Sequence, residues 1–263
     1  MTPPQPPIHA VLLDIDGTLY FAGDWIDSAL DTVRWLLNRN LQVRFLTNTT
    51  TTSRRAVCQR FAPHLDVPED WFFTPARAAY RWFRAQASPP TSILPLVHSD
   101  VLPDLGDLPL VHDENADVVL LGDMDDEWTI DALNTGLRAL LNGATLVALA
   151  RNRHWKARDG YRLDIGAFVA ALEYGADARC ETVFGKPNPV FFSAPLNEMG
   201  IEPGHALMVG DDLEGDVIGA VNAGLQGVLV KTGKFRPALL DNIPAHIPAI
   251  DSIAVLPDLL RES

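Results

Sequence analysis

Short apolar runs alternate with helix-like segments along the first third of the chain. Residues 8–13 form one such run, rich in branched side chains, and residues 42–46 form a second that leads into a hydroxyl-rich loop. A short continuous apolar run that ends at polar residues predicts a buried strand of a parallel sheet. Residues 26–38, 54–61 and 75–86 are predicted to form helices. The order strand, helix, strand, helix predicts βαβ units.

The same alternation restarts in the middle of the chain. It follows residues 88–92, a stretch of serine, proline and threonine that is typical of a linker. The predicted strands of this middle part are residues 93–97, 118–121 and 145–150, and its predicted helices are residues 129–141 and 165–174.

The pattern of the first part returns near residue 181. A helix is predicted to begin at residues 183–187, and strands are predicted at residues 205–209 and 227–231. We therefore expect an α/β fold in which a Rossmann-like parallel-sheet core is interrupted by an inserted α/β domain. The expected boundaries are 1–88 and 181–263 for the core and 89–180 for the insert.

Composition and charge narrow the classes of function. The chain has 263 residues, 47% of them hydrophobic and 21% charged, which is an ordinary globular mixture and excludes a disordered or fibrous chain. Its formal net charge of −13 disfavours binding to nucleic acid and to anionic membranes, since both are negatively charged. Neither is expected as a partner.

Two further features bear on where the protein resides. The only two cysteines, Cys58 and Cys180, are too few for a disulfide framework and fit a reducing compartment. The proline-rich start lacks the basic and apolar regions of a signal peptide, and no apolar run approaches the roughly 18 residues of a membrane span. We expect a cytoplasmic protein.

Acidic residues follow two of the predicted buried strands. Asp14 and Asp16 are two positions apart at the end of the first strand, so both side chains can point the same way. A pair of carboxylates repels unless a cation lies between them, and Mg²⁺ is the hard cation that suits oxygen ligands. Asp211, Asp212 and Asp216 follow a later strand, and ligands of open parallel sheets gather at the carboxyl ends of strands. The two groups are therefore expected to meet in one crevice.

Each element also has an ordinary structural interpretation when taken alone. An Asp-x-Asp-Gly sequence is most often a turn, and Thr47 with Asn48 is typical of a strand-to-helix cap. Lys186 before a proline is typical of a solvated helix start. The ordered occurrence of all of these at strand ends or helix starts is what indicates a catalytic site.

These motifs resemble those of haloacid-dehalogenase-type phosphatases. The run at residues 14–20, Asp-Ile-Asp-Gly-Thr-Leu-Tyr, resembles the first motif of the family. Thr47 resembles the second motif and Lys186 the third. The run at residues 210–212, together with Asp216, resembles the fourth. The insert after the second motif is similar to a C2-type cap of the NagD-like and 4-nitrophenylphosphatase branch. Residues 151–166, 168–174 and 230–237 are similar to the subgroup of phospholysine phosphohistidine inorganic pyrophosphate phosphatase.

The resemblance implies roles for the motif residues. Asp14 would be the nucleophile that accepts the phosphoryl group, and Asp16 the acid and base that serves the leaving oxygen and then water. Asp14, the backbone carbonyl of Asp16, and Asp211 would bind Mg²⁺.

The remaining motif residues would bind the substrate or complete the site. The substrate phosphate would be bound by Thr47, Asn48 and Lys186. Asp212 and Asp216 would be either weaker metal ligands or residues that orient Lys186 and water.

The basic residues Arg151, Arg153, His154 and Lys156 cluster in the insert of this acidic protein. They are typical either of a solvated loop or of a cap loop that attracts an anionic substrate.

The sequence therefore predicts a Mg²⁺-dependent phosphatase acting on a small phosphorylated metabolite or pyrophosphate. The resemblance also implies a homodimer formed through the cap. A phosphotransferase or mutase that uses the same aspartyl-phosphate is the alternative. A signalling receiver, which is a single domain without such an insert, and a non-catalytic binding protein are the other hypotheses.

Overall fold

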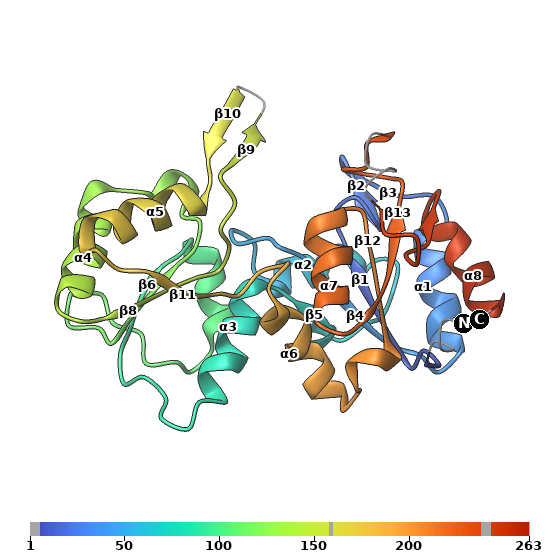
Figure 1. The fold of residues 1–263 in the computed structure, drawn as a ribbon, viewed down its shortest axis with the longest axis horizontal. Helices are drawn as coiled ribbons and strands as arrows, with labels where there is room; N and C mark the ends of the chain where they lie inside the picture. The colour runs from blue at the N-terminus through green and yellow to red at the C-terminus, as the bar shows by residue number, and fades with distance from the viewer. Residues whose placement is uncertain (1–5, 158–159, 238–242, 263) are drawn as a thin grey trace. The chain divides into compact units, whose positions relative to one another are not determined.

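The chain divides into two compact units (Figure 1). A computed structural model describes residues 6–157, 160–237 and 243–262. The first unit comprises the chain up to Thr47, residues 58–73, and the chain from Lys186 onward. The second comprises residues 48–57 and 74–185. The expected core and cap boundaries at residues 88 and 180 stay a prediction.

The first unit is built on a six-stranded parallel sheet in the order β14-β13-β12-β1-β4-β5. Its strands are β1 (Ala10–Asp14), β4 (Gln42–Leu46), β5 (Phe72–Phe73), β12 (Ala206–Gly210), β13 (Gln226–Val230) and β14 (Ala249–Ile250). The four longer strands confirm the predicted ones. The two-residue edge strands β5 and β14 were not predicted, because two residues are too few to show a pattern.

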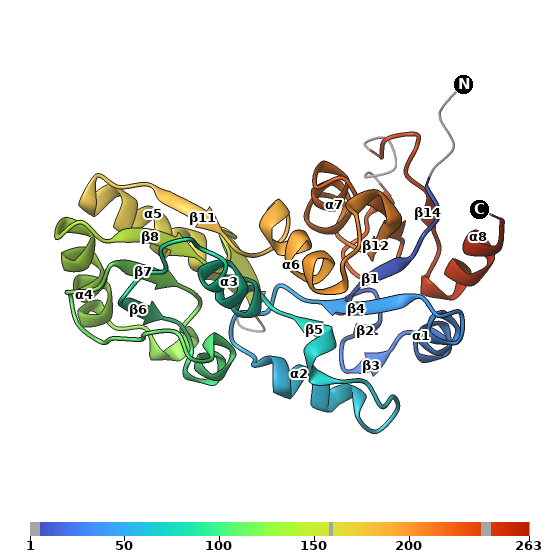
Figure 2. The same ribbon diagram turned by 90° about the horizontal axis from the view of Figure 1, so that it is seen from below.

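Helices cover both faces of this sheet (Figure 2). They are α1 (Ala29–Asn38), α6 (Pro189–Met199), α7 (Gly219–Asn222) and α8 (Leu256–Glu262). Helix α1 packs on α8, and α6 packs on α7. The crossovers from β1 to β4 and from β12 to β13 run in opposite directions along the sheet, so right-handed connections place α1 and α7 on opposite faces. The predicted Rossmann-like α/β core is confirmed.

Helix α6 begins later than the sequence predicted. Residues 180–183 form strand β11 (Cys180–Val183), and the helix begins only at Pro189, with the side chain of Asn188 accepting a hydrogen bond from the Val190 N–H at 3.0 Å. Prolines at 187 and 189 explain the delay, because a residue that precedes proline is disfavoured in the helical conformation. The expected helix start at residues 183–187 was therefore wrong.

The second unit contains a four-stranded parallel sheet in the order β11-β8-β7-β6. The other strands of this sheet are β6 (Ile93–Leu96), β7 (Val118–Leu121) and β8 (Thr145–Ala148), and the longer helices are α3 (Pro75–Arg84), α4 (Ile130–Leu141) and α5 (Ile165–Ala176). Leu146, Val169 and Leu172 belong to its buried apolar core. Helix α2 (Arg54–Phe61) runs from the second unit into the first.

A β-hairpin extends from the second unit where the sequence suggested a loop. Strands β9 (His154–Ala157) and β10 (Gly160–Leu163) pair antiparallel, and they lie beyond the start of α5 in Figure 1. A smaller hairpin in the first unit, β2 (Tyr20–Phe21) with β3 (Asp24–Trp25), follows β1. Among the described residues, no helix combines the length and the apolar character needed to cross a bilayer.

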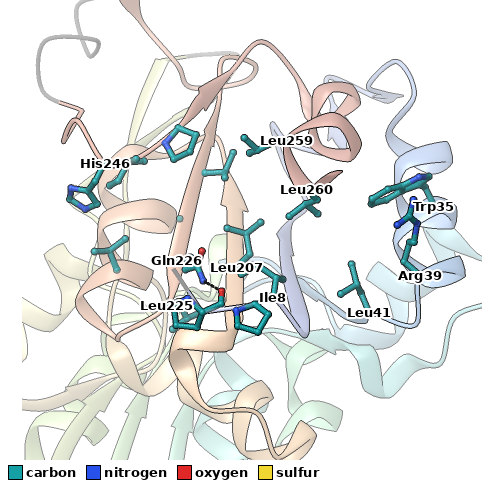
Figure 3. A pocket seen from close by; sticks show the side chains of 17 residues that line it. Ile8, Trp35, Arg39, Leu41, Leu207, Leu225, Gln226, His246, Leu259 and Leu260 are labelled. Atoms are coloured by element: carbon teal, nitrogen blue, oxygen red, sulfur yellow. Dashed lines mark hydrogen bonds between the residues drawn. The ribbon is translucent and has the colours of Figure 1, made fainter. Parts of the chain in front are cut away.

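An apolar cavity of about 720 Å³ lies in the first unit (Figure 3). Its walls include Ile8, Leu207, Leu225 and Leu260, and Gln226 donates hydrogen bonds of 2.9 Å to the carbonyls of residues 6 and 204 at its edge. Ile8, Leu207 and Gln226 lie within two residues of the starts of β1, β12 and β13. The cavity is therefore at the amino ends of these strands, and none of the predicted site residues lines it.

An aromatic cluster forms part of the core beside β4. Phe45 is completely buried, and its ring centroid is 4.8 Å from those of Phe61 and Phe72. We expect Phe45→Ala to lower the free energy of unfolding by about 3–5 kcal/mol, because it removes a large side chain from a packed site. Phe21→Ala, at a side chain that is 56% exposed, is the control and should change it by less than about 0.5 kcal/mol. Equal urea midpoints for the two variants would contradict this.

Candidate active site

Three buried carboxylates meet at the carboxyl ends of β1 and β12. The two strands pair in parallel register with Leu13 opposite Val209, so Asp14 and Asp211 follow at neighbouring strand ends. Asp216 lies in a π-helical turn, residues 213–218, directly after β12. Asp14, Asp211 and Asp216 are 5%, 1% and 1% exposed, and each offers an oxygen within 4.8 Å of the others.

Lys186 supplies the positive charge inside this group. Its Nζ donates a hydrogen bond to Asp14 Oδ1 and lies 2.6 Å from Asp216 Oδ1. Asp216 Oδ2 in turn accepts a hydrogen bond from the Asp212 N–H at 3.1 Å. The contact between Nζ and Asp216 places that residue beside Lys186, whereas the sequence left the place of Asp216 open.

Burial and mutual repulsion disturb the titration of the cluster. Burial, with the neighbouring charge of Asp216, raises the pKa of Asp14 well above its usual range, although Lys186 opposes the rise. Burial likewise raises the pKa of Asp211 to about 6. Burial opposes the charged form of Lys186, yet Asp14 and Asp216 raise its pKa above the ordinary lysine value. Three carboxylates against one ammonium leave an excess of negative charge when all are ionised.

This donor set fits a metal ion. All of the clustered ligand atoms are carboxylate oxygens, which is the chemistry that hard divalent cations prefer. The excess negative charge is buried, so a cation bound there would relieve the repulsion between the carboxylates. The residues present therefore could bind a divalent metal.

Asp16 lies apart from the buried trio. It is exposed, and its Oδ2 accepts a hydrogen bond from Thr47 Oγ1 at 3.3 Å. Thr47 is 2% exposed and follows β4, the other neighbour of β1. Thr18, which was not among the predicted site residues, donates from Oγ1 to Asp14 Oδ2 at 3.2 Å. Its place in the Asp-Gly-Thr run was the available signal.

Asp212 forms an ion pair with Lys234. Its Oδ1 accepts from the Gly215 N–H at 2.9 Å, and its Oδ2 accepts from Lys234 Nζ at 2.9 Å. Burial would raise the pKa of Asp212, but Lys234 and the Gly215 N–H hold it below the ordinary value. Lys234 was not among the predicted site residues, although it lies in the run 230–237 that resembles the phosphatase subgroup.

The remaining predicted residues belong to the second unit. Asn48 lines a polar hollow of about 230 Å³ in that unit, together with threonines 49–51 and Asp164. Arg151 forms an ion pair of 2.7 Å with Glu173.

The rest of the basic cluster lies on the β9–β10 hairpin or just before it. Arg153 and His154 are exposed, and the imidazole of His154 packs edge-on against the Tyr161 ring. The side chain of Lys156 lies outside the described residues.

Comparison with known proteins identifies the family. A model of haloacid dehalogenase-like hydrolases matches residues 11–107, and a related model of the same hydrolases matches residues 183–259. The phospholysine phosphohistidine inorganic pyrophosphate phosphatase of Xenopus laevis is 36% identical over 239 residues, with 88% of this chain and 86% of that protein covered. The chain belongs to the haloacid dehalogenase-like hydrolase family.

Other relatives of this hydrolase agree with the assignment. The human haloacid dehalogenase-like hydrolase domain-containing protein 2 is 38% identical over 87% of this chain and 86% of its own length. The p-nitrophenyl phosphatase of Archaeoglobus fulgidus matches with a TM-score of 0.87 and 25% identity over 98% of this chain and all of its own. NagD of Escherichia coli matches with a TM-score of 0.84 and 25% identity, and the match covers 95% of this chain and 98% of NagD. The expected family and the expected phosphatase class are confirmed.

Removing the ammonium of Lys186 should make the stability of the hydrolase strongly pH-dependent. We expect Lys186→Met to lower the free energy of unfolding by about 3–5 kcal/mol at pH 8, because Asp14 and Asp216 lose their buried partner. Carboxyl pKa values raised above their unfolded values mean that the folded state binds more protons. The loss of unfolding free energy in Lys186→Met should therefore become smaller as the pH falls from 8 to 5.

The measurement is urea unfolding at several pH values. Lys231→Met is the matched control, because Lys231 pairs with Asp251, whose side chain is 86% exposed. Lys231→Met should lower the free energy of unfolding by less than about 1 kcal/mol at each pH. A Lys186→Met variant whose stability rises with pH would contradict the electrostatic account.

Proposed function

We propose that this hydrolase is a Mg²⁺-dependent phosphatase that hydrolyses a small phosphorylated metabolite or pyrophosphate. The observation that carries the proposal is the buried contact of Lys186 with Asp14, beside Asp211 and Asp216. It provides a carboxylate for attack, a cation for phosphate oxygens and a set of metal ligands. The names of the relatives, which include phosphatases of pyrophosphate and of nitrophenyl phosphate, support this substrate class.

Magnesium fits the carboxylate oxygens of this site. Asp14, Asp211 and the backbone carbonyl of Asp16 are the proposed ligands. When bound, Mg²⁺ would neutralise charge on the phosphoryl oxygens. Because Asp216 contacts Lys186 directly, we assign it the role of orienting that ammonium. Asp212, which pairs with Lys234, would support the site from outside the trio.

The reaction would proceed in two displacements at phosphorus. The Asp14 carboxylate attacks the phosphoryl group, and the bond to the leaving oxygen breaks while Asp16 donates a proton to it. Water then attacks the aspartyl-phosphate, Asp16 accepts its proton, and inorganic phosphate leaves. The Thr47 hydroxyl, the Asn48 N–H and the Lys186 ammonium would hold the phosphoryl oxygens, since transfer depends mainly on positioning and charge stabilisation.

The basic residues of the second unit would act at longer range. Arg153 and His154 are exposed, and with Lys156 they would attract an anionic substrate to an otherwise acidic protein. Arg151 forms an ion pair with Glu173, which partly neutralises its charge, so it would contribute less to the attraction of an anionic substrate.

The assignment of Asp14 and Asp16 is tested by replacing each with asparagine. Asp14→Asn should lower kcat by at least about 10³-fold on every phosphate ester, because an amide cannot attack phosphorus. Asp16→Asn should lower kcat by about 10²–10⁴-fold on alkyl phosphates, and less on 4-nitrophenyl phosphate, whose leaving group needs no proton.

The measurement is release of inorganic phosphate over a panel of esters with Mg²⁺. Asp31→Asn is the control, because that carboxylate is exposed and pairs with Arg34 one turn along the same helix. Wild-type turnover in Asp14→Asn would refute the mechanism. Transfer to added alcohols in place of phosphate release would indicate a phosphotransferase instead.

We also propose that the second unit mediates a homodimer. On the β9–β10 hairpin, Tyr161 and Leu163 are 74% and 64% exposed. A two-stranded hairpin is marginally stable alone, and apolar side chains gathered on it favour an interface. Light scattering should give twice the chain mass for the wild type and the monomer mass for Leu163→Ser. Tyr174→Ala, at a residue 93% exposed on α5, should leave the dimer intact. A monomeric wild type would refute this part.

A further inference from the structure

The loop after β13 contacts both strand ends that form the carboxylate cluster. Thr232 Oγ1 donates a hydrogen bond of 2.5 Å to the carbonyl of Gly17, in the turn that follows β1. The Lys234 N–H donates one of 2.6 Å to Asp211 Oδ2, after β12. Residues 232–234 thus join two loops that are nearly 200 positions apart in the sequence. None of the roles proposed above for the reaction uses these contacts.

Two glycines enclose the Asp211 carboxylate. Gly17 and Gly233 have φ values of 98° and 54°, in the left-handed region that favours glycine. A Cβ on Gly17 would lie 2.1 Å from Asp211 Oδ2, and one on Gly233 would lie 2.0 Å from it. Neither position has room for a side chain while Asp211 keeps its place. The close approach of the loop therefore fixes where this carboxylate can lie.

The side chain of Lys234 extends the same arrangement to the next acid. Its Nζ lies 2.9 Å from Asp212 Oδ2, while its backbone N–H donates a hydrogen bond to Asp211. One residue therefore contacts two consecutive carboxylates through different groups. Because the backbone contact does not depend on the side chain, the two contributions can be separated by mutation.

We propose that Thr232, Gly233 and Lys234 form a positioning clamp that holds Asp211 ready to bind the divalent metal of this hydrolase. The clamp ties the loop after β1 to the loop after β12 and engages Asp211 Oδ2, leaving its Oδ1 for the metal. The inference rests on the proposed metal-dependent function and adds residues that act through Asp211 without touching substrate.

Preorganisation is the physical reason for such a clamp. A buried carboxylate that repels its neighbours would move apart from them in the absence of a metal. Hydrogen bonds and steric enclosure hold it instead in the position that a metal needs. Losing such outer contacts typically lowers metal affinity by about 10–100-fold. The affinity for Mg²⁺ therefore reports on the clamp independently of turnover.

The decisive experiment compares two glycine substitutions in the full-length protein. Mg²⁺ is titrated calorimetrically into protein stripped of metal. Gly233→Ala should raise the dissociation constant for Mg²⁺ by about 10–100-fold, because its Cβ displaces Asp211. Gly200→Ala is the matched control: its φ is 65°, but a Cβ there meets no atom within 4 Å. It carries the same backbone strain and should bind Mg²⁺ like the wild type.

Milder variants at Thr232 and Lys234 keep the test decisive if Gly233→Ala does not fold. Thr232→Val removes the hydrogen bond to Gly17 with little change of shape and should weaken Mg²⁺ binding by about fivefold. Lys234→Met leaves the backbone N–H in place and should weaken Mg²⁺ binding by at most about fivefold. Lys234→Arg should restore the affinity for Mg²⁺. Lys231→Met, which removes the pair with Asp251, should have no effect. Wild-type affinity in Thr232→Val and, where it folds, in Gly233→Ala would overturn the clamp.

Asp211→Asn distinguishes failure of the clamp from failure of the metal site. If Asp211→Asn loses Mg²⁺ binding while the loop variants keep it, the clamp is wrong and the proposed metal function stands. If Asp211→Asn binds Mg²⁺ like the wild type, the proposed metal site itself is wrong, and the clamp falls with it.

Discussion

A buried lysine between two buried carboxylates organises the first unit of this hydrolase. Lys186 contacts Asp14 and Asp216, and all three side chains are shielded from water. Isolated charges in such surroundings would cost several kcal/mol each, so they persist only when paired. Asp211 adds a third buried carboxylate to the group. The result is a cluster of surplus negative charge, suited to a cation, that includes Asp14, the proposed nucleophile.

The sheet topology explains why these charges meet. β1 is flanked by β12 and β4, so the loops after three adjacent strands share one edge of the sheet. Asp14, Asp211 and Thr47 stand at these strand ends. The apolar cavity of Figure 3 lies at the opposite, amino ends of the strands, and none of these three residues lines it. The carboxylate cluster therefore lies at one end of these strands, and the largely apolar cavity lies at the other.

Close packing of backbone is the second constraint on the site. Gly17, Gly210 and Gly233 each approach a carboxylate so closely that a Cβ would lie within 2.3 Å of one of its oxygens. These glycines allow charged side chains to be enclosed by peptide groups, which supply hydrogen bonds without bringing further charge. The motif glycines of the sequence thus have a steric role as well as a conformational one.

The sequence alone determined the longer strands, the family and the residues at the strand ends, because apolar runs and the polar groups that terminate them are local patterns. It could not identify β11 or the β9–β10 hairpin, whose half-polar strands show no clear alternation. Nor could it decide between Asp212 and Asp216, four positions apart on one turn. Only the tertiary structure placed Asp216 against Lys186 and Asp212 against Lys234. Such partners come from distant segments, and no local pattern encodes which carboxylate each lysine will meet.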